Sequence, residues 1–140
     1  MKNARNVLLA YVEGFDLHDI AERIEGRFRD FANGRTWKAQ EIAVINERHP
    51  PCPDDGPDDL PPWSLGLNFT LPDKNERRDD WHDDVRATVE FLVQLHVDFG
   101  RDFMIAVHDR VRGFNEDVAS IRSTTPDMES IYSMIDAHRA

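Results

Sequence analysis

The sequence predicts an α+β protein with a ferredoxin-like antiparallel sheet, in the order β-α-β-β-α-β, two helices on one face and a further C-terminal helix. Short apolar segments alternate in that order with two long segments whose apolar residues recur every 3.6 positions. Each long segment carries its apolar residues on one stripe, so both helices are expected on the same face of the sheet. The 140 residues, 40% of them apolar, suit a single domain over residues 1–140.

The first half begins with an expected strand at residues 7–12, VLLAYV, which is apolar on both faces. Residues 16–32 are expected to form a helix in which Asp16 is the N-cap and Asn33-Gly34 marks the end. Its apolar stripe consists of Leu17, Ile20, Ala21, Ile24, Phe28 and Phe31.

Two strands are expected next, at residues 38–47 and 64–71. In SLGLNFTL, residues 64–71, leucine and phenylalanine alternate with small or polar residues, so one side should face the core. The other side, around Asn68 and Thr70, should line an open sheet face unless the terminal helix folds over it. Because the first strand is apolar on both sides, we expect something to cover part of that face.

The longest helix is expected at residues 75–99, followed by an apolar strand at residues 103–107, FMIAV. For residues 108–122 the pattern indicates a turn at Gly113 and fits either a short strand or a helical turn after it. A terminal helix should begin at Thr125-Pro126, because threonine is a good N-cap and proline suits the first helical position.

Residues 50–62, PPCPDDGPDDLPP, contain six prolines and no basic residue. Proline fixes φ and lacks an amide hydrogen, so this segment is expected to be a stiff, extended, acidic surface loop. Trp63 follows it directly and is either the anchor of the loop or part of an interface rim. The loop aspartates are Asp54, Asp55, Asp58 and Asp59.

A second acidic run, DDWHDD, occupies the start of the longest predicted helix and contains Asp79, Asp80, Asp83 and Asp84. Carboxylates are favoured there by the helix macrodipole. A hard cation such as Mg²⁺ is an alternative, but the glycine-broken loop of a calcium site is missing. We therefore expect no metal, and we expect this run, the loop aspartates and Trp63 to form a partner-binding surface.

The formal net charge of −10 indicates the kind of partner. Nucleic acids and anionic membranes are disfavoured, because binding phosphate needs basic residues, whereas a cationic partner is favoured. The apolar run near the N-terminus is too short for a signal peptide, and no run is long enough to span a bilayer. With Cys52 as the single cysteine, no internal disulfide can form, and we expect a cytoplasmic protein.

No enzyme motif is present, neither a nucleophile elbow nor a phosphate loop. The six histidines lack zinc-ligand spacing. His108-Asp109 could be an acid/base pair, but adjacent residues of a strand point to opposite faces. The sequence therefore predicts a protein that is not an enzyme and has no cofactor.

In size, acidity and α+β organisation, the chain resembles the immunity proteins of bacterial polymorphic toxin systems. The segments that suggest this are PWSLGLNFTL, residues 62–71, and GFNED, residues 113–117. The resemblance implies an antitoxin-type protein that occludes a cognate cationic toxin domain with its acidic surface. The alternatives are a small hydrolase-type enzyme with an Asp/His site and a non-catalytic adaptor subunit.

Overall fold

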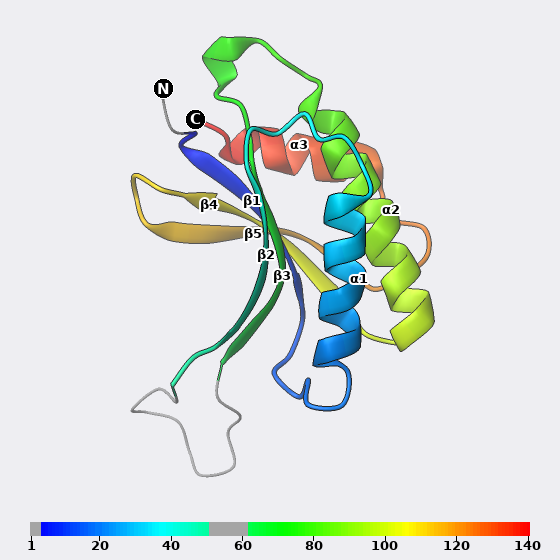
Figure 1. Cartoon of the computed structure of the whole chain (residues 1–140). Helices are drawn as coiled ribbons and strands as arrows, with labels where there is room; N and C mark the ends of the chain where they lie inside the picture. Colours follow the sequence, from blue (N-terminus) through cyan, green and yellow to red (C-terminus); the bar gives the residue numbers. More distant parts are fainter. Residues whose placement is uncertain (1–3, 51–61) are drawn as a thin grey trace.

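The structure of the chain is a computed structural model that describes residues 4–50 and 62–140 (Figure 1). The strands of its single antiparallel sheet have the order β2-β3-β1-β4-β5. The elements along the chain are β1 (Asn6–Val12), α1 (Ala21–Asn33), β2 (Ile42–Arg48), β3 (Trp63–Thr70), the 3-10 turn η1 (Lys74–Glu76), α2 (Trp81–Phe99), β4 (Phe103–Asp109), β5 (Phe114–Ile121) and α3 (Met128–His138).

The helices α1, α2 and α3 pack on the same face of the sheet, and α3 runs crosswise to α1 and α2 (Figure 1). One continuous apolar core lies between the two layers. The strands contribute every second residue to it, as a half-buried sheet requires, and each helix contributes the residues of its apolar stripe. Its fully buried members include Leu8, Ala10, Ile24, Phe28, Leu65, Leu67, Phe69, Leu92, Phe103 and Ile135.

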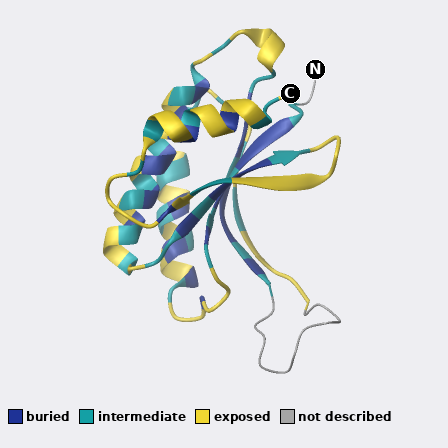
Figure 2. Ribbon diagram, turned by 180° about the vertical axis from the view of Figure 1, so that it is seen from behind, coloured by how far each residue is buried: buried dark blue, intermediate teal, exposed yellow. Residues whose placement is uncertain are grey.

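The α+β class and the antiparallel sheet are confirmed, but the sheet has one more strand than the sequence predicted. The segment left open at residues 108–122 is a hairpin: β4 continues to Asp109, a turn with Gly113 at φ +76° follows, and β5 returns along β4. Most of β5 is exposed (Figure 2). An edge strand that buries so little shows no apolar alternation, so the sequence pattern could not reveal it.

Several predicted boundaries differ from the structure. Helix α1 begins at Ala21 rather than at residue 16, and Asp16 does not cap it but forms an ion pair with Arg101, which precedes β4. The hydrogen bond from Arg101 lowers the pKa of the Asp16 carboxyl. Helix α2 begins at Trp81 rather than at residue 75, and α3 is capped by Asp127, which accepts from the Ser130 amide at 3.2 Å.

No helix among the described residues lies on the opposite face of the sheet, so α3 does not cover that face (Figure 2). The side chain of Tyr11 lies over Gly66, where a Cβ would collide with the ring and with the Ala10 carbonyl. Burial raises the pKa of the Tyr11 hydroxyl, Asn68 lowers it, and the Glu47 carboxylate raises it. On this face of β1, Val7 is buried and Leu9 and Tyr11 are half-buried, although no helix among the described residues lies over them. No helix among the described residues has the length and apolar character to cross a membrane.

Candidate functional site

The four aspartates of the DDWHDD run point in different directions around the start of α2. Successive helical residues are rotated by about 100°, so neighbours in sequence face different surroundings. Asp84 faces the core, Asp80 faces the segment before the helix, and Asp79 and Asp83 face solvent. The run is therefore not a single acidic surface.

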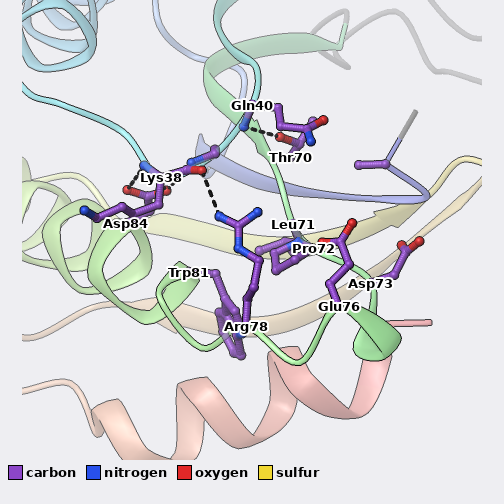
Figure 3. A pocket seen from close by; sticks show the side chains of 12 residues that line it. Lys38, Gln40, Thr70, Leu71, Pro72, Asp73, Glu76, Arg78, Trp81 and Asp84 are labelled. Carbon is purple, nitrogen blue, oxygen red and sulfur yellow. Dashed lines mark hydrogen bonds between the residues drawn. The ribbon is translucent and has the colours of Figure 1, made fainter. Parts of the chain in front are cut away.

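Asp84 is only 1% exposed, and its side chain stabilises the fold. Its carboxylate accepts hydrogen bonds from the Lys38 amide at 3.1 Å and from the Ala39 amide at 2.8 Å (Figure 3). It also accepts one from Arg35 at 3.0 Å. These bonds hold the connection between α1 and β2 against α2. The free space beside this carboxylate is about 20 Å³, room for about one water molecule. The predicted partner surface must therefore exclude Asp84.

Asp80 is paired within its own segment. Both of its oxygens accept from Arg78 at 3.1 Å, a bidentate geometry that lowers the pKa of the carboxyl. Arg78 also donates to the Lys38 carbonyl at 3.3 Å (Figure 3). Asp80 keeps 40% of its side chain exposed but has a cation beside it already.

Asp79 and Asp83 are exposed and lie on the rim of a hollow between the start of α2 and α3. The hollow has a volume of about 780 Å³, and α3 adds Glu129 and Asp136 to its rim. Arg78, Arg86 and Arg139 also line it. Asp136 is paired with Arg139 at 2.9 Å. Among the described residues, none forms an ion pair with Asp79, Asp83 or Glu129. We call these three carboxylates and the aromatic rings between them the α2–α3 hollow.

The lining of the α2–α3 hollow includes an aromatic pair. The rings of His82 and Tyr132 are stacked, with centroids 4.2 Å apart and planes inclined by 17°. The Tyr132 hydroxyl donates to the His82 carbonyl at 3.4 Å and accepts from Arg86 Nε at 3.3 Å. Trp81 packs edge-on against the His82 ring from the buried side. Flat aromatic faces beside free carboxylates suit a guanidinium or ammonium group.

Asp54, Asp55, Asp58 and Asp59 lie outside the described residues, so their part of the predicted surface stays a prediction. Trp63, which follows the loop, is 8% exposed and donates from Nε1 to Asn46 at 2.6 Å. The Arg48 guanidinium lies 4.0 Å from its ring centroid. Trp63 thus packs as an anchor at the start of β3.

The candidate acid/base pair is separated by the sheet. His108 lies on the open face, 2.6 Å from Asn115, whereas Asp109 accepts from Arg5 at 3.0 and 3.1 Å. The hydrogen bonds from Arg5 hold the pKa of the Asp109 carboxyl well below its usual range. The described part of the chain contains no group of three or more histidine, cysteine or acidic side chains placed to hold a metal ion.

No sequence pattern joins α3 to the acidic run. Glu129 and Tyr132 lie about fifty residues downstream of Asp79, and only the packing of α3 beside α2 brings them together. The one available signal was that Tyr132 shares a helical stripe with Ile131 and Ile135 while carrying a polar hydroxyl. A second pair also appears only in the fold: His49 Nε2 lies 3.1 Å from Ser64 Oγ across β2 and β3.

Comparison of the chain with protein-family models, curated proteins and solved structures found no match.

Proposed function

We propose that this protein binds a cationic protein partner and, as an immunity protein of the antitoxin type, neutralises a cognate toxin domain by occluding its active site. The α2–α3 hollow supports the proposal, because three carboxylates that form no ion pair with a described residue surround an aromatic pair there. Of the three arginines that line the hollow, Arg78 is already paired with Asp80 and Arg139 with Asp136. An arginine or lysine side chain entering the hollow would gain a ring face and a carboxylate together. The acidic loop would add steering of a basic partner over longer distances.

The first experiment tests whether the hollow selects cations. A hexa-arginine peptide is titrated into the protein, and binding is followed by NMR chemical shifts and calorimetry. The variant Asp79→Asn/Asp83→Asn/Glu129→Gln should bind about tenfold more weakly, because three exposed pairs of about 0.5 kcal/mol each add to about 1.5 kcal/mol.

The control carries the same change in charge elsewhere. Asp19→Asn/Glu22→Gln/Asp30→Asn removes three exposed carboxylates around α1 that form no ion pair among the described residues. It should change the affinity less than twofold. Equal losses in both variants would mean that only net charge matters and that the hollow is not the site.

The second experiment tests the antitoxin function. A cationic toxin domain encoded beside the gene for this protein is co-expressed with it, and growth is measured. Protection that is lost in the hollow variant but kept in the α1 control supports neutralisation by occlusion. Binding without protection favours the adaptor alternative.

The hydrolase-type alternative has one specific observation in its favour. Ser64 Oγ and His49 Nε2 lie within hydrogen-bond distance, as a nucleophile and its general base must. No described carboxylate contacts the His49 ring to orient it, in contrast to a complete triad. A Ser64→Ala variant that abolished turnover of an ester substrate such as p-nitrophenyl acetate would favour this alternative over the binding protein.

The finer fold assignment and the location are part of the same proposal. We propose that β1–β4 with α1 and α2 form a ferredoxin-like unit, supported by the order β2-β3-β1-β4, to which β5 and α3 are added. An immunity protein of this kind acts in the cytoplasm, and a chain with one cysteine needs no oxidising compartment.

A further inference from the structure

The two edges of the sheet differ in how well they are protected from pairing with another strand. An edge strand presents a row of unpaired N–H and C=O groups, which proteins block with bulges, prolines or charges. β5 contains a bulge between Asp117 and Ala119, where its register against β4 shifts. β2 pairs with β3 in an unbroken register from Ile42 to Arg48 and contains no proline, and its two charged residues, Glu47 and Arg48, lie at its C-terminal end.

The register identifies which backbone groups of β2 are free. The Thr70 amide donates to the Glu41 carbonyl at 3.1 Å, and the His49 amide donates to the Pro62 carbonyl at 2.8 Å. Hydrogen-bonded pairs alternate along an antiparallel ladder, so the odd-numbered residues of β2 bond to β3. The even-numbered residues therefore point their N–H and C=O groups away from the sheet. These residues are Ile42, Val44, Asn46 and Arg48.

We propose that β2 pairs antiparallel with β2 of a second copy of this chain, about a two-fold axis at Ile45. In this register Ile42 bonds to Arg48 of the other copy and Val44 bonds to Asn46. The Ile45 side chains of the two copies meet on the axis, and Ala43 faces Glu47. A C2 interface of this kind joins the two sheets into one of ten strands.

Charge and backbone chemistry select this register over its neighbours. The proposed register sets Glu41 of one copy opposite His49 of the other, so no like charges face each other at this pair. In the neighbouring register, in which one strand is shifted by two residues, Glu41 lies opposite Glu47 of the other copy on the same face. Like charges directly opposite each other destabilise a sheet. The opposite shift brings Pro50 into a hydrogen-bonding position, where it has no amide hydrogen to donate.

This surface is independent of the α2–α3 hollow. β2 and β5 are opposite edges of the sheet, and α3 packs beside β4 and β5. A dimer through β2 would therefore leave the α3 side of the hollow free for a partner in each copy. If the protein does not bind the cationic peptide at the hollow, the dimer proposal still stands. If the protein is monomeric, the proposal of a cation site in the hollow still stands.

The test uses sedimentation velocity on the full chain over a wide concentration range. We expect a species of twice the 16.2 kDa chain mass that dissociates on dilution. Ile45→Lys should weaken the dimer at least tenfold, because two lysines would then face each other on the axis. Ala43→Lys, with the same added charge on the same face of β2, should keep or tighten the dimer, since each lysine faces Glu47 of the other copy.

Hydrogen exchange gives a second readout that does not depend on a variant that folds. Amides of Val44 and Asn46 should exchange more slowly as protein concentration rises, whereas those of Asn115 and Asp117 on β5 should not change. A protein that stays monomeric at the highest concentration overturns the proposal. So does a dimer that is insensitive to Ile45→Lys or whose β2 amides show no concentration dependence.

Discussion

Asp83 and Asp84 are neighbours in the chain with opposite uses in the molecule. Asp84 is buried and bonded to Arg35 and to two backbone amides, while Asp83 is exposed on the rim of the α2–α3 hollow and forms no ion pair with a described residue. The rotation of about 100° between successive helical residues separates them. A run of like charges therefore contains both fold-stabilising and free carboxylates, and only the free ones are available to a partner.

Substitution of the buried Asp84 should have the largest effect on stability. Asp84→Ala should lower the free energy of unfolding by about 3–5 kcal/mol, because it leaves the Arg35 charge and two amides without their acceptor. Chemical denaturation followed by circular dichroism measures this. A variant as stable as the parent would show that the connection between α1 and β2 does not depend on this carboxylate.

Substitution of Asp109 should have an intermediate effect on stability, since its side chain is 16% exposed and is hydrogen-bonded to Arg5. Its pKa is depressed in the folded state, so its contribution to stability is present above the unfolded pKa of about 4 and is lost as pH falls toward the folded value. Asp109→Asn should flatten the decline in unfolding free energy below about pH 4. Thermal melts of both proteins between neutral and strongly acidic pH provide the measurement, and parallel pH profiles would contradict the expectation.

Asp80 should matter less, although its geometry with Arg78 is bidentate. Because 40% of the side chain is exposed, Asp80→Asn should cost roughly 0–1 kcal/mol of unfolding free energy. The effect should shrink further in molar salt, which screens exposed charges. Denaturation at low and high salt tests this. A loss of stability that does not depend on salt would mean that Asp80 stabilises the fold through packing rather than through its charge.

Asp79 and Asp83 should have the smallest effect on stability. Asp79→Asn/Asp83→Asn should leave the unfolding free energy within about 0.5 kcal/mol of the parent, since surface changes away from specific contacts are close to neutral. The same substitution should slow association with a cationic partner and weaken its salt dependence. Stopped-flow mixing at several salt concentrations measures the rate, and loss of stability instead would move these residues into the fold-stabilising group.

Replacement of the four loop aspartates with asparagine extends the comparison beyond α2. We expect unchanged thermal stability and slower association, as for Asp79 and Asp83, because surface charges contribute little to folding. Unfolding of that variant would show that the loop is structural. A folded variant with unchanged binding would restrict the partner surface to the α2–α3 hollow or to the open face around Asn68 and Thr70.

The sequence by itself determined the elements that bury an apolar surface. β1, β3 and the stripes of α1 and α2 were predictable because burial imposes a period of 2 on strands and 3.6 on helices. β5 was not, because an exposed edge strand is held by backbone hydrogen bonds that leave no pattern in its side chains. The start of α1 was misplaced because Asp16 is bonded to Arg101, a residue 85 positions away.

The tertiary structure alone decided which acidic residues are free and what lies beside them. Composition fixes the net charge, but the fate of each carboxylate depends on cations and amides that the chain brings from elsewhere. Arg35 reaches Asp84 from the α1–β2 connection, and α3 places Glu129 and Tyr132 beside Asp79. Contacts between residues fifty positions apart have no local period, so they exist only once the helices have packed.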